Sequence, residues 1–177
     1  MPLSENIFLT GFMGSGKTTA GKKLAKLLRL KFIDLDQFIE QKEKLTIRSL
    51  FENFGETAFR NIEQTCLNEL LASEKSTVIA LGGGTICYEK NLEKIKAKGC
   101  LIYIELPAIT LVQRLEASKT ERPLLKNLKG EDLVDFITTK LKEREIFYSA
   151  ADIAISGLNL TPQLLQQKIS EHKKKHN

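Results

Sequence analysis

Residues 11–18 read Gly-Phe-Met-Gly-Ser-Gly-Lys-Thr and match the GxxxxGK[ST] pattern in full. The apolar run 6–10 before them is typical of a buried strand, and the pattern 17–30 after them is typical of a helix. Glycines let backbone N–H groups approach phosphate oxygens, and the start of a helix adds its positive dipole end. The Lys17 ammonium suits the outer phosphates, and the Thr18 hydroxyl suits Mg²⁺. The stretch predicts binding of a nucleoside triphosphate but does not identify the molecule that receives a phosphate.

The rest of the chain alternates short apolar runs with longer amphipathic stretches, which predicts strands joined by helices. Strands are expected at 6–10, 31–34, 77–81, 100–106 and 153–155. Helices are expected at 17–30, 36–42, 46–53, 56–73, 89–98, 108–117 and 131–150, and from Thr161 onward with Pro162 in the first position. Right-handed crossovers between such strands produce a parallel sheet with both faces covered. We therefore expect an α/β chain with a three-layer P-loop NTPase-like fold around a mostly five-stranded parallel sheet.

Length and composition favour one compact domain over residues 1–177, since 42% hydrophobic and 28% charged residues are ordinary values for a globular protein. The segment 118–129 is polar and joins two helices, and a connection of that length is usually functional. We expect it to be a mobile lid. The basic end of the chain, 171–177, is expected to be a solvated and frayed terminus.

Several classes of protein are disfavoured by what the sequence lacks. The net charge is +5, but the basic residues form no stripe with interleaved aromatics, so no nucleic-acid partner is expected. The first residues carry no targeting signal and no apolar run is long enough to span a membrane. Cys66, Cys87 and Cys100 form no CxxC pair, which favours free thiols. We expect a cytoplasmic monomer with no membrane partner.

Two carboxylates follow the second predicted strand, at Asp34 and Asp36. In extended chain, residues i and i+2 point the same way, so both could face a site beside the phosphate loop. One could organise water around Mg²⁺, and the other could accept a hydrogen bond from an attacking hydroxyl. Asp36 could equally be the N-cap of the following helix. The spacing leaves these two interpretations of Asp36 open.

Three further features are candidates for contacts with an acceptor. Arg60 could form an exposed ion pair with Glu56 or Glu63, and Arg144, which also has acidic neighbours, is equally ambiguous. Three glycines in succession at the end of an apolar strand favour close approach of a ligand or of another backbone segment. An arginine in the polar segment could stabilise charge on a transferring phosphoryl group. The glycines are Gly82, Gly83 and Gly84, and the arginine is Arg122.

Taken together, these motifs resemble the shikimate kinase family. The resemblance runs from Asn6 to about Ile155 and rests on several motifs in the right order. They are GFMGSGKTT (11–19), FIDLD (32–36), FGETAFRNIE (54–63), the glycines at 82–84, RPLL (122–125) and RxxxYxxA (144–151).

The resemblance implies a role for each matching residue. Asp34 would hold Mg²⁺ through water, together with Thr18. Asp36 would contact the shikimate hydroxyls and orient or deprotonate the attacking one, and Gly83, within 82–84, would contact shikimate through its backbone. Arg60 and Arg144 would clamp the substrate carboxylate, and Arg122 would reach the ATP phosphates as the lid arginine. The phosphate cradle would consist of Gly14, Ser15, Gly16, Lys17, Thr18 and Thr19.

The activity that the resemblance implies is transfer of the γ-phosphate of ATP to the 3-hydroxyl of shikimate, a step of chorismate and aromatic amino acid biosynthesis. The alternatives are a kinase for another small polyol acid or a nucleotide, and a nucleotide-binding homologue without catalysis. Members of the family often carry an arginine about seven residues before the lid arginine, near the adenine, and Arg114 matches that position only approximately.

Overall fold

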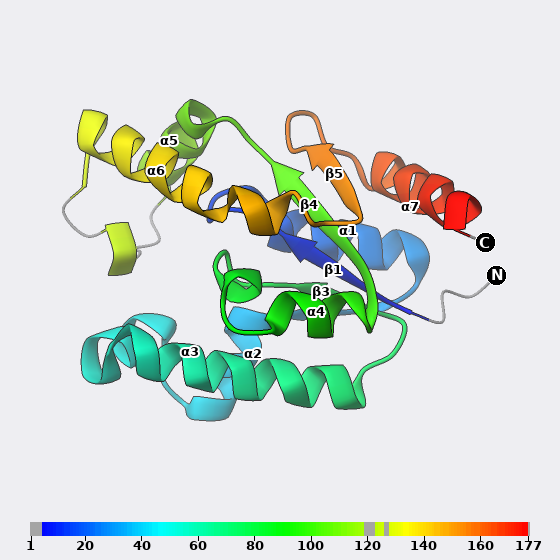
Figure 1. Cartoon of the computed structure of the whole chain (residues 1–177), viewed down its shortest axis with the longest axis horizontal. Coiled ribbons are helices and arrows are strands. Elements are labelled where there is room, and N and C mark those ends of the chain that lie inside the picture. The colour runs from blue at the N-terminus through cyan, green and yellow to red at the C-terminus, as the bar shows by residue number, and fades with distance from the viewer. Residues whose placement is uncertain (1–4, 119–122, 126–127, 177) are drawn as a thin grey trace.

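The computed structural model describes residues 5–118, 123–125 and 128–176, whose arrangement is shown in Figure 1. Within these residues, parallel strands form one sheet in the order β2-β3-β1-β4-β5. The strands are β1 (Asn6–Thr10), β2 (Lys31–Asp34), β3 (Thr77–Ala80), β4 (Gly99–Glu105) and β5 (Ile153–Ser156). The predicted five-stranded parallel sheet is confirmed.

Helices cover both faces of this sheet, with α4 in front of it and α1 behind it in Figure 1. The α-helices are α1 (Lys17–Leu28), α2 (Leu35–Glu43), α3 (Ile47–Ser73), α4 (Asn91–Lys96), α5 (Ala108–Glu116), α6 (Gly130–Tyr148) and α7 (Pro162–His176). The described residues also include the 3-10 turns η1 (Thr85–Cys87) and η2 (Pro123–Leu125). In the described parts of the chain, no helix combines the length and the apolar character needed to cross a membrane. The predicted three-layer α/β architecture is confirmed.

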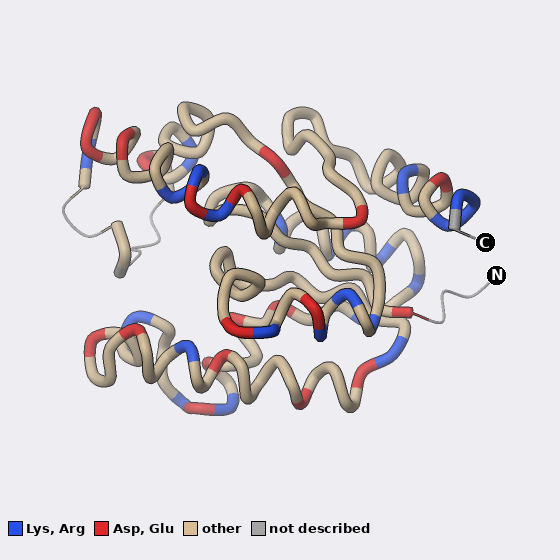
Figure 2. The backbone as a smooth tube through the Cα atoms, viewed as in Figure 1, with Lys and Arg blue, Asp and Glu red and all other residues tan. Residues whose placement is uncertain are grey.

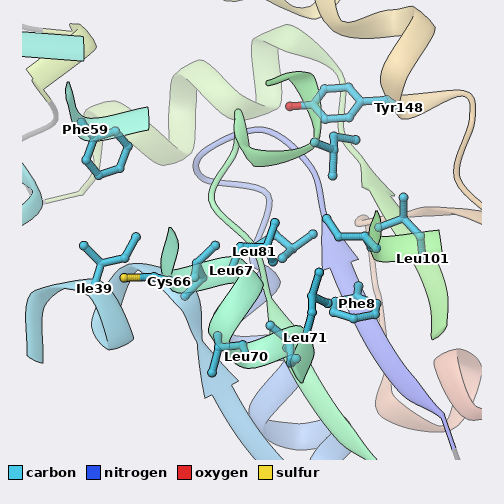
Figure 3. Packing of buried hydrophobic residues seen from close by; sticks show 14 of the residues in the cluster. Phe8, Ile39, Phe59, Cys66, Leu67, Leu70, Leu71, Leu81, Leu101 and Tyr148 are labelled. Atoms are coloured by element: carbon cyan, nitrogen blue, oxygen red, sulfur yellow. The ribbon is translucent and has the colours of Figure 1, made fainter. Parts of the chain in front are cut away.

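The two faces of the sheet are buried against different helices, because successive residues of a strand point to opposite faces. Phe8 of β1 packs in one cluster with Leu67 and Leu70 of α3, as Figure 3 shows. Its neighbours Ile7 and Leu9 pack in a second cluster with residues of α1 and α7. Each of these five side chains is at most 1% exposed. The strand that leads into the phosphate loop is therefore held from both sides.

The helix α3 is kinked at Gly55, where φ is 78° and ψ is 173°. That conformation lies outside the helical region and is readily adopted only by glycine. The sequence predicted two helices, 46–53 and 56–73, and the kink falls between them. The second part, which begins at Glu56, contributes to the same apolar cluster as Phe8 of β1 and carries the buried Arg60.

The basic end of the chain is helical in the residues that the structure describes, and the expected fraying of 171–177 stays a prediction. Helix α7 continues to His176, and Asn177 lies outside the described residues. Leu165 and Ile169 anchor this helix in the core. Lysines are good helix formers, so an anchored helix extends readily through them. Figure 2 shows their charges at the end of α7.

Part of the polar segment 118–129 is also attached to the fold. Its η2 turn is described, and Leu125 and Leu128 pack against the apolar cluster that contains Phe12. The apolar residues of the segment are therefore anchors between α5 and α6, which the polar composition did not predict. The expected mobility of this lid stays a prediction.

The parallel register brings three loops to one edge of the sheet. Asp34 at the end of β2 pairs with Ala80 of β3, and Ala80 pairs with Leu9 of β1. Since the strands are parallel and in register, the segments that follow them leave the sheet at the same level. The phosphate loop, the Asp34–Asp36 turn and the glycines 82–84 therefore meet at the carboxyl edge of the sheet.

Candidate active site

The phosphate loop ends in a helix whose first turn is open to an anion. Gly14 and Gly16 have φ angles of 84° and 93°, a region that glycine adopts without strain. Gly16 is the N-cap of α1 and has no side chain that could accept hydrogen bonds from the first N–H groups of the helix. These N–H groups and the helix dipole favour a phosphate at this position.

Lys17 folds back along the loop that precedes it. Its Nζ donates to the carbonyl oxygen of Gly11 at 2.8 Å and to that of Phe12 at 3.0 Å. The ammonium therefore lies over the loop in which a phosphate chain would be cradled. The next residue, Thr18, faces away from these carbonyls and toward β2.

Thr18 of α1 and Asp34 at the end of β2 form the second part of the nucleotide side. The Thr18 hydroxyl donates to Asp34 Oδ2 at 2.6 Å. The other carboxylate oxygen, Oδ1, accepts from the backbone N–H of Gln37 at 3.3 Å, so Asp34 is the N-cap of α2. The N-cap interpretation of Asp36 is therefore wrong, because the helix begins two residues earlier than that interpretation requires.

Asp36 lies in the first turn of α2 and is not in extended chain, so the i, i+2 argument for its direction is also wrong. It nevertheless reaches the site. Its Oδ1 is 3.2 Å from the position that a Cβ on Gly82 would occupy. Glu63 Oε1 and Thr85 Oγ1 approach the same position, at 2.7 and 2.8 Å. The glycine thus makes room for three oxygen-bearing side chains.

Arg60 is buried rather than exposed, with 9% of its surface accessible. Its Nη1 donates to Glu63 at 2.8 Å, and its Nη2 donates to Glu56 at 3.2 Å. Both predicted partners are thus correct, but the predicted exposure is wrong. Burial lowers the pKa of Arg60, and the Glu63 and Glu56 carboxylates outweigh this effect, so that the pKa is raised above its ordinary value. The guanidinium is a fixed positive charge.

Arg144 reaches the same region from α6. Its Nη1 donates to the carbonyl oxygen of Gly83 at 3.0 Å, and its guanidinium lies 5.3 Å from the centre of the Phe12 ring. The Tyr148 hydroxyl donates to the same carbonyl at 2.7 Å. Burial raises the pKa of Tyr148, so its hydroxyl remains a donor. The glycine segment is therefore held by two residues of α6.

A small pocket brings these groups together. Both arginines, Asp36 and all three glycines line it, so the structure unites the candidate acceptor contacts that lie far apart in sequence. Its other walls are apolar or acidic. The complete lining is Met13, Asp36, Ile47, Phe51, Phe59, Arg60, Glu63, Gly82, Gly83, Gly84, Leu124 and Arg144.

The sequence interpretation missed several members of this site. Glu63 was considered only as an exposed partner of Arg60, yet it is 1% exposed. Thr85 and Tyr148 were given no role, although Tyr148 belongs to one of the quoted motifs. Their spacing from Arg60, Arg144 and the glycines could have indicated these residues. Spacing alone does not show which way a side chain points until the fold is known.

Two other arginines were named from the sequence. Arg114 of α5 lies beside the phosphate loop, because its Nη1 is within 3.4 Å of the carbonyl oxygens of Gly14 and Ser15. Arg122 lies outside the described residues. Among the described residues, no group of three or more His, Cys, Asp or Glu side chains could hold a metal ion.

An acceptor pocket that shares the sheet edge with a phosphate loop defines a P-loop kinase for a small molecule. Comparison with known proteins gives the family. The model of that family, described as shikimate kinase, matches residues 13–173. The chain belongs to the shikimate kinase family.

Individual relatives agree with this assignment. A shikimate kinase of Parabacteroides distasonis is 43% identical over 153 residues, which are 86% of this chain and 88% of the relative. The structure of a shikimate kinase from Bacteroides thetaiotaomicron superposes with a TM-score of 0.88 at 34% identity, covering 94% of this chain and 98% of that one. A shikimate kinase from Acinetobacter baumannii in complex with shikimate has a TM-score of 0.85 at 37% identity, with 96% of each chain covered.

Proposed function

We propose that this protein transfers the γ-phosphate of ATP to the 3-hydroxyl of shikimate, giving shikimate 3-phosphate and ADP. Membership of the family and the relative in complex with shikimate support this activity. The observation that carries it is the pocket in which Arg60 and Arg144 lie with Asp36. A hydroxy acid has two kinds of polar group, a carboxylate and hydroxyls. The two guanidinium groups suit the substrate carboxylate, and the Asp36 carboxylate suits a hydroxyl donor.

On the nucleotide side, the loop and the start of α1 would bind the phosphates of ATP. The Lys17 ammonium would leave the carbonyls of Gly11 and Phe12 for the outer phosphates and offset the charge that develops during transfer. Thr18 and Asp34 fit Mg²⁺, because they place two oxygen donors together beside the first turn of a helix. When bound, Mg²⁺ supplies positive charge to the phosphates.

On the acceptor side, Asp36 would accept the hydrogen bond of the attacking hydroxyl and take its proton. Arg60 and Arg144 would fix the substrate carboxylate, and the backbone at Gly83 would complete the contact. Such a site works by positioning two reactants, and it needs little covalent chemistry of its own.

We also propose that Arg122 is the lid arginine and contacts the ATP phosphates. The protein is proposed to be a monomer in the cytoplasm.

The activity is tested by coupled measurement of ADP release with shikimate, gluconate or a nucleoside monophosphate as the acceptor. We expect release with ATP and shikimate, and little release with the other two. Turnover with gluconate or with a nucleotide in place of shikimate would identify the alternative kinase. ATP binding without release for any acceptor would identify a homologue without catalysis.

Replacing either arginine of the pocket by lysine is expected to raise the KM for shikimate. A lysine keeps the charge but cannot reproduce the planar fork that matches a carboxylate. Arg60→Lys and Arg144→Lys should each raise this KM by about tenfold or more, while the KM for ATP stays nearly constant. Steady-state kinetics with each substrate varied in turn measure both values.

The two arginine changes should be non-additive, because both residues hold one carboxylate. Shikimate methyl ester provides the control, since it lacks the negative charge. The ester should be a poor substrate of the natural protein, and either arginine change should leave the KM for the ester nearly constant. If the ester is phosphorylated as well as the acid is, the carboxylate clamp does not exist.

Replacing Gly84 by alanine is expected to disturb Arg60 without straining the backbone. Gly84 has a φ of −111°, which any residue adopts, but a Cβ there would lie 2.7 Å from Arg60 Nη2. Two carboxylates hold that guanidinium in place, so displacing it weakens its contact with the substrate carboxylate. Gly84→Ala should raise the KM for shikimate by about tenfold and lower the melting temperature, because the buried Glu63 carboxylate loses part of its bond to Arg60. A variant with normal KM would show that Arg60 can move without loss of binding.

A further inference from the structure

The carboxylate of Glu63 is buried and has two partners on different elements. It is 1% exposed. One oxygen, Oε2, accepts from Arg60 Nη1 at 2.8 Å, and the other, Oε1, accepts from the Thr85 hydroxyl at 2.6 Å. A buried carboxylate is costly unless both of its oxygens are hydrogen-bonded. Thr85 therefore satisfies the oxygen that Arg60 does not.

Thr85 is well placed for this task because its backbone is fixed independently. Its N–H donates to the carbonyl oxygen of Gly82 at 3.2 Å, and its own carbonyl oxygen accepts from Asn91 Nδ2 at 3.0 Å. The residue is fully buried. The hydroxyl is thus held in one direction, toward Glu63, by the turn that follows the glycine segment.

The position of Glu63 matters because Asp36 is close to it. Both carboxylates lie within about 3 Å of the point where a Cβ on Gly82 would stand. Two negative charges that lie this close to one point repel each other. The bonds to Thr85 and Arg60 hold Glu63 in place against this repulsion.

We propose that Thr85 is a positioning residue for the substrate carboxylate: its hydroxyl holds Glu63, and Glu63 holds the Arg60 guanidinium in the pocket. This inference rests on the proposed function, since it assigns the work of Thr85 to the same substrate. Thr85 is fully buried and does not line the pocket. Its contribution is therefore expected in the binding of shikimate, without an equal effect on the binding of ATP.

The test compares Thr85→Val with Thr85→Ser. Valine keeps the shape of threonine but lacks the hydroxyl, and serine keeps the hydroxyl. Loss of a hydrogen bond to a charged group should raise the KM for shikimate by about tenfold to a hundredfold in Thr85→Val. The KM for ATP should stay within about twofold of its natural value. In Thr85→Ser, which keeps the hydroxyl, the KM for shikimate should also stay within about twofold of its natural value.

Thr77→Val is the matched control, because Thr77 is 1% exposed at the start of β3 and its hydroxyl also lies near a glutamate, Glu74, at 3.4 Å. It should change the melting temperature without changing the KM for shikimate. Thr85→Ala is a second variant without the hydroxyl and should show the same rise as Thr85→Val. If the valine variant does not fold, Thr85→Ala tests the role of the hydroxyl in its place.

A double-mutant cycle with Glu63→Gln separates this chain of contacts from a general loss of stability. If Thr85 acts through Glu63, adding Thr85→Val to Glu63→Gln should raise the KM for shikimate much less than it does in the natural protein. Additive effects, or an unchanged KM in folded Thr85→Val, overturn the inference and leave the proposed function intact. Absence of shikimate phosphorylation by the natural protein overturns the proposed function itself.

Discussion

Lys17→Ala is expected to lower the turnover number by about 10²- to 10³-fold, the usual effect of removing one group that stabilises transition-state charge. The Lys17 ammonium lies over the phosphate loop, held by the carbonyl oxygens of Gly11 and Phe12 at 2.8 and 3.0 Å. From there it can reach the outer phosphates of a bound nucleotide. Turnover is measured at saturating ATP and shikimate, and circular dichroism verifies the fold.

Two further variants make this result specific. Lys17→Arg keeps the charge with a different shape, and it should retain more activity than the alanine variant. Lys23 lies on the exposed side of the same helix, so Lys23→Ala should have normal turnover. Near-normal turnover in a folded Lys17→Ala protein would refute the proposed mechanism of the phosphate loop.

Asp36→Asn is expected to lower the turnover number by about 10²-fold or more while ATP binding persists. Asparagine keeps the shape of the side chain but is a much weaker base. Because Asp34 rather than Asp36 is the N-cap of α2, the change does not remove the cap. The favourable interaction of a negative charge with the first turn is lost, which costs about 0.3–1 kcal/mol of stability. Turnover and ATP affinity are measured on the same preparation.

Asp132 is the matched control for that stability term, because it also lies in the first turn of a helix, α6, and is exposed. Asp132→Asn should lower the melting temperature by a similar small amount and leave turnover unchanged. Were Asp36→Asn to behave like Asp132→Asn, the carboxylate would have no part in handling the acceptor hydroxyl.

Much of the architecture could be predicted because its signals are local. The phosphate loop is contained in eight consecutive residues, and each strand is a short apolar run whose pattern reports burial directly. The sequence also predicted that Cys66, Cys87 and Cys100 are free thiols, and this is confirmed. The predicted start of α2 was wrong, because Asp34 rather than Asp36 is its N-cap.

The acceptor pocket could be predicted only through the resemblance to a family, because its parts are distant in sequence. Arg144 and Gly83 lie 61 residues apart and meet at a hydrogen bond of 3.0 Å. Spacing along one helix showed that Arg60 could pair with Glu63, but not that the pair is buried. Whether a helical face is exposed depends on which other elements pack against it.

The sequence by itself therefore determined the nucleotide loop, the alternation of strands and helices, and the family. The tertiary structure alone decided that Thr18 of α1 meets Asp34 at the end of β2, that Gly82 admits Asp36, Glu63 and Thr85 to one place, and that Arg60 is held inside. The physical reason is the range of the interactions. Hydrogen bonds within a loop and hydrophobic periodicity act over a few residues, whereas the direction of a buried side chain is set by close packing against elements from elsewhere in the chain.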